Sequence, residues 1–394
     1  MLVSVESDSH RTGAAPATGP LQYARVVQRA SVAYVPLNVL IELTHRCHLD
    51  CVHCYLEDNH AHEARSRELT TEELIRLIDD LTDAGCLFLT LSGGEIFLRR
   101  DTVHVARYAR SRGLAIRFFT AGLLLTPELI DSITELHPLS IEFSLYSAEN
   151  PGLHDAITRV PGSHAKTLWA LRELSARRIP VVIKTPLMRS VFQEYPGIIA
   201  LARALGAAYL LDPTVTPKND GNLSTCALRV TPDQLAELYA DPTLPVVDEI
   251  KTLASRQRLR DPEDEVCNLG KMGCAISPFG DVYPTLGFPW AAGNVRERPF
   301  QAIWKESPVF VKLRGLKIKD LGVCSGCEKS TYCNRCCMWA LMDDGDLLGG
   351  SSWACGIAAA KERAAGLPTK PTPHQVKLGQ QADTELSIPL HVMF

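Results

Sequence analysis

The sequence predicts an α/β fold: a partial (β/α)6 barrel of the TIM type, followed by a small cysteine-rich C-terminal domain. Three observations support this prediction. Strand-like and helix-like segments alternate six times between residues 37 and 213. Glycine-rich and polar motifs follow the predicted strands, at the end where such barrels carry their active sites. From residue 267 onward the composition shifts and cysteines become frequent.

Apolar and β-branched runs predict six strands in the barrel. They cover residues 37–44, 87–91, 115–119, 139–145, 181–187 and 208–211. Helices are predicted between them, over residues 70–81, 101–112, 127–136, 164–177 and 196–205. Thr70 with Glu73 forms a capping signal, and Pro127 suits the first position of a helix. This alternation implies parallel strands joined by right-handed crossovers.

The remaining segments give the predicted domain boundaries. The first 20 residues are rich in Ser, Thr, Ala, Gly and Pro, which is typical of disorder. A hairpin is predicted over 277–284, with its turn at Gly280-Asp281. The predicted domains are a partly disordered N-terminal extension (1–36), the barrel (37–213), a linker region with a helix over 231–240 (214–266), the cysteine-rich domain (267–365) and a tail (366–394).

The composition is that of a soluble globular protein, with 46% hydrophobic and 22% charged residues. A net charge of −4 indicates neither a nucleic-acid partner nor a membrane surface. No apolar run approaches the roughly 18 residues that span a bilayer, and the N-terminus lacks a secretory signal. The 13 cysteines are therefore expected to bind metal in a reducing compartment, the cytoplasm, rather than to form disulfides.

Three cysteines, Cys47, Cys51 and Cys54, follow the first predicted strand at spacings of x3 and x2. Three thiolates on a tight loop can hold three corners of a [4Fe–4S] cube, which leaves the fourth iron open to bind and activate a ligand. The alternative is structural zinc, which usually takes paired C-x2-C knuckles and four ligands. The first spacing is too long for such a knuckle, so the pattern favours iron–sulfur.

The second predicted strand ends in Ser92-Gly-Gly-Glu95. Taken alone, two glycines at a strand end indicate an ordinary turn. Together with the cysteine loop and the barrel pattern they resemble the radical S-adenosylmethionine (SAM) superfamily, and the C-terminal cysteines resemble its SPASM extension. The resemblance covers residues 37–360.

The resemblance implies a set of cofactor-binding residues. Cys47, Cys51 and Cys54 would hold the catalytic cluster, and SAM would chelate its open iron. Gly93 and Gly94 would let the backbone approach the SAM amino group, with Glu95 nearby. Ser144 and Arg159 match SAM-contacting positions, although either residue type is also common on surfaces and at helix caps.

The C-terminal cysteines follow the spacing Cys324-x2-Cys327-x5-Cys333-x3-Cys337, with Cys355 further on. The resemblance implies two auxiliary clusters. Cys324, Cys327, Cys333 and Cys355 would hold one [4Fe–4S] cluster, and Cys267, Cys274 and Cys337 would hold the other.

The second of these ligand sets departs from the family pattern, which expects Gly-x4-Cys after the hairpin, because Thr285 occupies that cysteine position. Three interpretations remain: an open iron that binds substrate or a non-cysteine ligand, substitution by Cys336, or a smaller or missing cluster. The first is favoured, so one or two auxiliary clusters are expected.

The resemblance also implies the activity. An external donor of the flavodoxin or ferredoxin type would supply an electron for reductive cleavage of SAM. The resulting 5′-deoxyadenosyl radical would abstract hydrogen from a peptide or protein, giving a crosslink, a thioether or an epimerised residue in the maturation of a ribosomal peptide natural product. Since 46 residues precede the cysteine loop, a separate recognition protein is expected. Cys226 is a candidate hydrogen-atom donor, with a structural role as the alternative.

Three other functions stay open. One is radical SAM chemistry on a small molecule or tetrapyrrole, although such enzymes usually carry fewer auxiliary cysteines. Another is sulfatase-maturase-like oxidation, which is disfavoured because Leu286 stands where those relatives have a catalytic Asp. The last is a non-catalytic iron–sulfur electron-transfer module.

The first prediction concerns the cysteine loop. Replacing Cys47, Cys51 and Cys54 together by Ala removes all three proposed cluster ligands, so release of 5′-deoxyadenosine from SAM should be abolished. Chromatography of anaerobic reactions with a chemical reductant measures this release. Undiminished release by the triple variant would exclude the mechanism.

Overall fold

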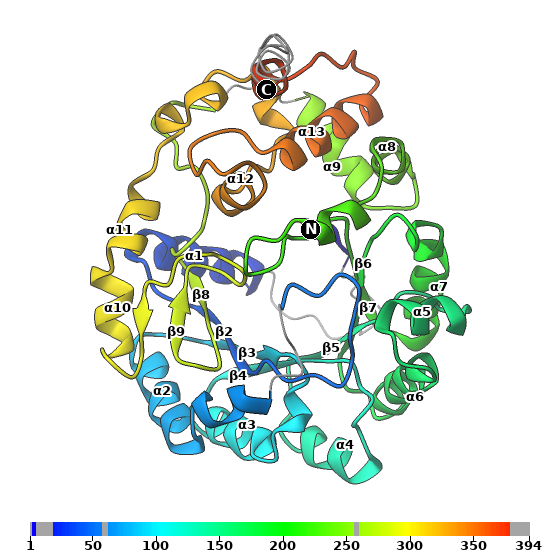
Figure 1. Cartoon of the computed structure of the whole chain (residues 1–394), viewed down its shortest axis with the longest axis vertical. Coiled ribbons are helices and arrows are strands. Elements are labelled where there is room, and N and C mark those ends of the chain that lie inside the picture. Colours follow the sequence, from blue (N-terminus) through cyan, green and yellow to red (C-terminus); the bar gives the residue numbers. More distant parts are fainter. Residues whose placement is uncertain (1, 5–18, 57–61, 256–259, 379–394) are drawn as a thin grey trace, which may run out of the picture. The chain divides into compact units, whose positions relative to one another are not determined.

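The computed structural model describes residues 2–4, 19–56, 62–255 and 260–378. The chain divides into two compact units (Figure 1). The first comprises Met1–Arg229 and Asn268–Arg314, and the second comprises Val230–Cys267 and Gly315–Phe394. None of the helices in the described ranges combines the length and apolar character that a bilayer crossing requires.

The first unit is built on one ten-stranded sheet with the order β1-β7-β6-β5-β4-β3-β2-β8-β9-β10. Its centre is a run of six parallel strands, and all six predicted strands are confirmed. They are β2 (Asn38–Thr44), β3 (Phe88–Gly93), β4 (Ala115–Thr120), β5 (Ser140–Ser144), β6 (Val181–Pro186) and β7 (Ala208–Asp212).

Four further strands extend the sheet at both edges. β8 (Gly273–Ile276) pairs in parallel with β2, and β9 (Asp281–Tyr283) and β10 (Gly293–Asn294) follow it antiparallel. At the other edge β1 (Leu2–Ser4) pairs antiparallel with β7. An incomplete barrel leaves two edges with unpaired backbone groups, and these strands satisfy them.

These edge strands change the predicted domain boundaries. Residues 2–4, in the segment expected to be disordered, form β1, and most of the rest of that segment lies outside the described residues. The predicted hairpin is present, with Gly280 at φ +93°, but it belongs to the first unit rather than to the C-terminal domain. The predicted linker is divided, since residues 214–229 join the first unit and residues 230–266 the second.

Helices surround the outer side of the parallel strands (Figure 1). They are α2 (Thr71–Asp83), α3 (Thr102–Ser111), α4 (Pro127–Thr134), α5 (Pro151–Thr158), α6 (Ser163–Ala176) and α7 (Tyr195–Leu205). Thr70 and Glu73 form the predicted capping box of α2, and Thr126 caps α4 with Pro127 in its first turn. Helix α5 was not predicted; it lies between β5 and α6, where the sequence analysis placed no element.

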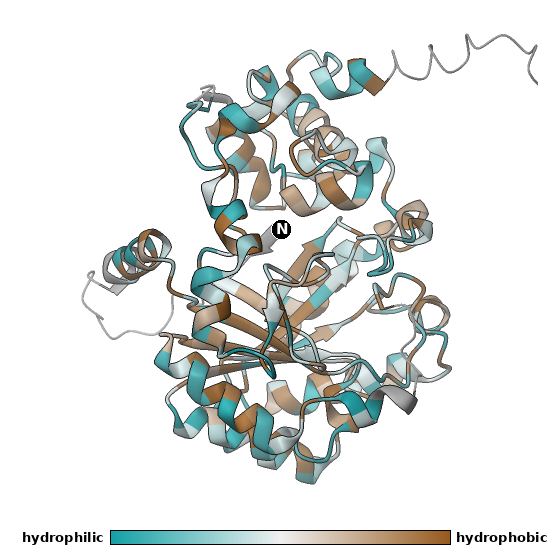
Figure 2. Cartoon of the chain, turned by 60° about the vertical axis from the view of Figure 1, so that its left-hand side comes forward, coloured by the Kyte–Doolittle hydropathy of each residue, from teal (hydrophilic) through white to brown (hydrophobic). Residues whose placement is uncertain are grey.

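The two faces of the strands differ in chemistry. Outward residues such as Val39, Ile41 and Leu43 are at most 1% exposed, and α2 supplies Leu74, Leu77, Ile78 and Leu81 as buried apolar side chains. Figure 2 shows the brown strands and the teal outer sides of the helices that cover them. The inward positions, by contrast, include Glu142 and Lys184, so the interior is polar where complete barrels carry layers of Val, Ile and Leu.

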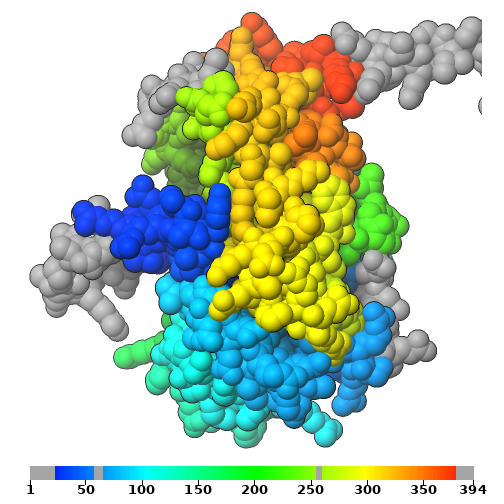
Figure 3. Space-filling view, turned by 90° about the vertical axis from the view of Figure 1, so that its left-hand side faces the viewer, coloured from blue at the N-terminus to red at the C-terminus, as the bar shows by residue number. Residues whose placement is uncertain are grey.

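The segment after β10 covers one side of the sheet. It contains α10 (Phe300–Glu306) and the start of α11 (Pro308–Gly315), and Figure 3 shows it in yellow against the blue and cyan residues of α2 and its neighbours. The Arg296 guanidinium contacts the Glu73 carboxylate at 2.7 Å, and holds the pKa of Glu73 down at about 2. This ion pair ties the end of the hairpin segment to the first turn of α2.

Trp304 on α10 joins this segment to the N-terminal helix α1 (Gly19–Ala33). The Trp304 side chain is 2% exposed, and its indole N–H donates to the carbonyl of Tyr34 at 2.5 Å. Its ring stacks with Phe300 and packs against Phe310, with centroids 6.1 and 4.8 Å away. The guanidinium carbon of Arg314 lies 4.4 Å from the indole centroid.

The second unit is mainly helical, with α8 (Pro232–Ala240), α9 (Val246–Ser255), α12 (Cys337–Asp344) and α13 (Ser352–Ala364). The prediction of a helix over 231–240 is confirmed by α8. Helix α13 packs against α8, and a buried ion pair joins Lys329 to Glu362 on α13. Arg363 pairs with Asp233 at 3.2 Å on the surface of this unit.

The second prediction concerns Trp304. A Trp304→Phe change removes the donor to the Tyr34 carbonyl and part of a buried ring, which should destabilise the protein by about 1–2 kcal/mol. Trp290→Phe is the matched control, because Trp290 is 39% exposed. Thermal unfolding followed by circular dichroism should show a lower midpoint for the Trp304 variant than for the wild type. The Trp290 variant should keep the wild-type midpoint. Equal midpoints would contradict this account of Trp304.

Candidate catalytic and iron–sulfur sites

A cavity of about 270 Å³ opens at the carboxyl ends of the parallel strands in the first unit. The three loop cysteines and the ends of strands β3 to β6 line it together, which confirms that the topology gathers the predicted motifs. The lining includes Cys47, Cys51, Cys54, Ser92, Gly93, Gly94, Phe119, Thr120, Glu142, Ser144, Tyr146, His154, Lys184 and Leu286.

Glu42 on β2 holds both flanks of the cysteine loop. This buried carboxylate accepts a hydrogen bond from the Tyr55 hydroxyl at 2.5 Å, and its other oxygen lies 3.2 Å from Nε2 of His45. His45 precedes the loop cysteines and Tyr55 follows them, so one side chain fixes the two ends of the loop above the strand from which it starts.

The middle of the loop is fixed to the end of α5. The amides of Asp50 and Val52 donate to the carbonyls of Thr158 and Ile157 at 3.1 and 3.0 Å. Arg159, in the left-handed region at φ +57°, reaches the Asp50 carboxylate at 2.7 Å. The Arg159 side chain is 57% exposed and is not among the cavity-lining residues. Arg159 therefore contacts the cysteine loop through Asp50, and its contact with SAM stays a prediction.

Gly93 and Gly94 bring two strand ends into backbone contact. The amide of Gly94 donates to the Thr44 carbonyl at 2.7 Å. A Cβ atom on Gly93 would lie 2.2 Å from the Thr44 oxygen, and one on Gly94 would lie 2.3 Å from the Arg46 oxygen. Both glycines line the cavity, as the sequence predicts, but they are also required because the chain entering the cysteine loop presses directly on them.

Glu95 is fully buried and joins β3 to β4. Its carboxylate accepts hydrogen bonds from the Thr120 hydroxyl at 2.9 Å, the Ala121 amide at 3.0 Å and the Phe97 amide at 3.2 Å. Burial raises the pKa of Glu95, and these three donors counteract that rise. Glu95 is not among the cavity-lining residues, so it acts on the site by setting the position of the neighbouring strand ends.

Tyr146, two residues beyond the predicted Ser144, joins the cysteine loop to β5. The Tyr146 hydroxyl lies 2.7 Å from Nε2 of His53, and both side chains line the cavity. Burial lowers the pKa of His53 to about 4, so the ring is neutral at pH 7. Ser144 lies on the cavity wall as the sequence predicts.

His154 is a buried residue that lines the cavity. The Tyr146 amide donates to Nδ1 of His154 at 3.3 Å, so the neutral ring carries its proton on Nε2. Burial lowers the pKa of His154 to about 4, with His164 adding to the effect. His154 is 1% exposed, and its Nε2 has no hydrogen-bond partner among the described residues. His154 therefore contributes a neutral ring to the cavity wall.

The thiols of the loop also fit a metal cluster. Burial raises the pKa of Cys47 and Cys51 to about 12, so these groups ionise at neutral pH only beside a strong positive charge such as iron. A [4Fe–4S] cube takes one thiolate at each of three separate irons, and three cysteines around one cavity provide that arrangement.

Lys184 and Glu142, which both line the cavity, form an ion pair. The Lys184 ammonium lies 3.3 Å from the Glu142 carboxylate and 3.4 Å from the centre of the Phe119 ring. Burial lowers the pKa of Lys184, and Glu142 counteracts this. The sequence analysis did not single out these residues, although their alternation with the buried Phe118, Phe143 and Ile183 could have shown that they face inward.

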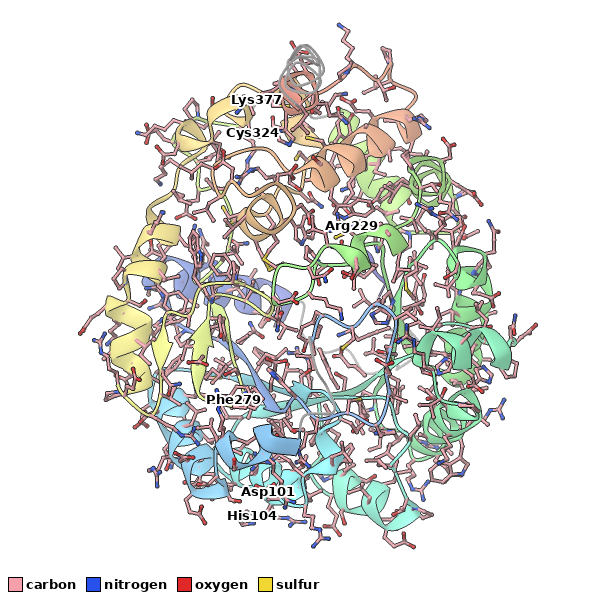
Figure 4. The ribbon with its side chains drawn as sticks, in the orientation of Figure 1. Asp101, His104, Arg229, Phe279, Cys324 and Lys377 are labelled. Atoms are coloured by element: carbon pink, nitrogen blue, oxygen red, sulfur yellow. The ribbon has the colours of Figure 1, made fainter. Side chains whose placement is uncertain are left out.

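The second unit contains a small cavity of about 40 Å³ lined by four cysteines. They are Cys324, Cys327, Cys333 and Cys355, the set that the sequence predicts for one auxiliary cluster. Cys324 is labelled in Figure 4. The Thr372 hydroxyl donates to the sulfur of Cys355 at 3.2 Å, so a residue from the predicted C-terminal tail also contributes to this site.

The other predicted ligand set is divided between the units. The sulfur atoms of Cys267 and Cys337 lie 3.8 Å apart in the second unit, and Cys336 is near enough to Cys267 to raise its own pKa, after the larger effect of burial. Cys274 lies buried on β8 of the first unit. Burial raises the pKa of Cys274, and the charge of the Cys86 thiol adds to this effect. Thr285 also belongs to the first unit.

Cys226 lies in the short 3-10 helix Ser224–Leu228 and is half-buried. It is not among the residues that line the catalytic cavity. Leu286, by contrast, reaches that cavity directly, so the segment that follows the hairpin contributes to the cavity wall.

Comparison with known proteins agrees with this geometry. The model of the radical SAM superfamily matches residues 41–202, and that of the SPASM iron–sulfur cluster-binding domain matches residues 267–328. An AdoMet-dependent heme synthase of Methanosarcina barkeri is 29% identical over 79% of this chain and 94% of its own. Mycofactocin maturase MftC of Mycolicibacterium smegmatis is 28% identical over 85% and 87%, and PqqA peptide cyclase of Xanthomonas euvesicatoria is 30% identical over 76% and 82%.

The fold is shared with SuiB of Streptococcus suis. That structure superposes with a TM-score of 0.63 and 14% sequence identity, and the match covers 88% of this chain and 84% of SuiB. At this identity the likeness concerns the fold alone.

The third prediction concerns Gly94. In a Gly94→Ala variant the new Cβ meets the backbone of residues 45 and 46, which cannot yield as a flexible side chain would, so the cysteine loop must shift. We expect this variant to lose iron and sulfide equal to one cube per chain after anaerobic reconstitution. Gly315→Ala is the control, because no atom lies within 4 Å of the position of its new Cβ. Wild-type iron content in the Gly94 variant would contradict the proposed constraint.

Proposed function

This chain belongs to the radical SAM superfamily, and from that premise we propose that it is a maturase that modifies a ribosomally made peptide in the cytoplasm. The superfamily and its SPASM domain establish the cofactors as SAM, a [4Fe–4S] catalytic cluster and auxiliary iron–sulfur clusters. Bound SAM and its cluster supply the hydrogen-abstracting chemistry. The residues of this chain bind these groups, orient the substrate and keep water away from the reacting carbon.

The catalytic cluster is proposed to be held by Cys47, Cys51 and Cys54, which share one cavity. Gly93, Gly94 and Ser144 line the same cavity and are the proposed SAM contacts. Glu95 and Arg159 support the site by holding strand ends and the cysteine loop.

The observation that carries the peptide assignment is the second cysteine-lined site. Cys324, Cys327, Cys333 and Cys355 converge on a site remote in sequence from the catalytic loop, and the maturase and cyclase relatives match this chain over more than three quarters of its length. Extra clusters suit oxidative peptide chemistry, because they can accept the electron that remains when a new bond forms. An external electron donor and a separate peptide-recognition protein complete the proposed system.

A tetrapyrrole substrate is the second candidate, favoured by the match to a heme synthase. The cavity argues against it. A tetrapyrrole with several carboxylate side chains requires several cations, and among the described lining residues Lys184 is the one lysine or arginine, already paired with Glu142. Leu49, Leu56, Phe119 and Leu286 add apolar surface to this polar wall, and that surface can contact a peptide side chain.

The fourth prediction tests the substrate. The chain is co-expressed with a short peptide encoded beside its gene, and the peptide is analysed by mass spectrometry. Loss of two hydrogens indicates a crosslink. A mass that is unchanged after reaction in H2O but raised by deuterium uptake after reaction in D2O indicates epimerisation. Both should disappear with the Cys47/Cys51/Cys54→Ala variant. An unmodified peptide, together with loss of carbon dioxide from a carboxylated tetrapyrrole, would replace the first proposal by the second.

A further inference from the structure

Arg335 is a buried arginine in the middle of the auxiliary cysteine sequence, between Cys333 and Cys337. Arg335 is 7% exposed. Guanidinium groups remain charged at any pH that a protein experiences, so this is a permanent positive charge inside the second unit. Such a charge is retained in an interior only when its N–H groups find acceptors.

Two of those acceptors are backbone carbonyls of the loop that precedes α13. Arg335 donates from Nε to the Gly349 carbonyl at 2.7 Å and from Nη2 to the Leu347 carbonyl at 2.5 Å. These two bonds fix the plane of the guanidinium group and leave its Nη1 donor available for another acceptor. A lysine, with its single ammonium on a flexible stem, cannot reproduce this fork.

The remaining contacts of Arg335 are with cysteine sulfur atoms of both proposed clusters. Nη1 donates to the sulfur of Cys337 at 3.4 Å, within the pair that Cys337 forms with Cys267. On its other side Arg335 lines the cavity of Cys324, Cys327, Cys333 and Cys355. Within that cavity Arg335 forms a side-chain hydrogen bond with Cys324.

We propose that Arg335 is a shared hydrogen-bond donor and positive charge for the thiolates of both auxiliary clusters, and that it raises the reduction potential of each. Reduction adds negative charge to a cluster, and a fixed cation with N–H groups at its sulfur ligands stabilises that charge. Because one guanidinium faces both ligand sets, the two potentials are raised together. The proposal rests on the ligand assignment of the proposed function and is independent of the substrate.

The fifth prediction uses reconstituted enzyme in the Cys47/Cys51/Cys54→Ala background, so that the auxiliary clusters alone contribute to the signal. Redox titration monitored by electron paramagnetic resonance should show lower midpoints for both clusters in Arg335→Gln. A tenfold decrease in the equilibrium constant for one-electron reduction of a cluster lowers its midpoint potential by about 59 mV. Arg335→Lys keeps the charge and should shift both midpoints less. Arg363→Gln removes an exposed charge of the same unit and should shift neither.

Iron content is measured first, because loss of the fork could also release a cluster. If Arg335→Gln retains its auxiliary iron, unchanged midpoints overturn the proposal. If it loses iron, a second measurement on protein with Arg335 intact decides. This protein is labelled with 15N at the guanidinium nitrogens of arginine alone, because the Arg335 backbone amide also contacts Cys333. It carries Arg260→Lys because Arg260 lines the same cavity. Pulsed spectra of the reduced clusters should then show 15N coupling, and its absence would overturn the proposal. Neither readout requires peptide turnover, so failure of the peptide assignment would be seen separately.

Discussion

The backbone contact between the ends of β2 and β3 is the constraint on which the catalytic site depends. The Gly94 amide bonds to the Thr44 carbonyl, and no room remains for a Cβ atom on either glycine. This contact determines where the chain leaves β2 and hence where Cys47 begins its loop. Glu42 and the end of α5 then fix the rest of that loop. Gly93 and Gly94 thus determine the path of the cysteine loop and also form part of the cavity wall.

The division of polar and apolar residues along each strand produces the cavity. Outward side chains are apolar and pack under the helices, whereas inward ones include Glu42, Glu142 and Lys184, which cannot pack into dry layers. These charges are tolerated because each has a partner: Glu42 has Tyr55 and His45, and Lys184 has Glu142 and the face of Phe119. The same alternation therefore stabilises the barrel and keeps its centre open for ligands.

The two auxiliary ligand sets differ in how the fold treats them. The four cysteines of one set lie within a single unit and line one cavity, since short loops and the start of α13 bring them together. Those of the other set come from both units, with Cys267 and Cys337 in one and Cys274 in the other. Thr285, which replaces an expected cysteine, belongs to the first unit, as Cys274 does. The missing cysteine therefore lies in the segment that follows the hairpin and not in the second unit.

The sequence by itself determined the six parallel strands, the cysteine loop, the glycine pair and the four converging C-terminal cysteines, because strand periodicity and ligand spacing are local properties. Tertiary structure decided the rest. It brought Arg159 to Asp50 and Glu95 to Thr120, contacts that the sequence analysis did not predict because these partners are far away in sequence. The hairpin joined the sheet because β2 had a free edge, which spacing cannot reveal. Arg335 became visible as a link between two ligand sets only when the chain brought Gly349, Cys337 and Cys324 around it.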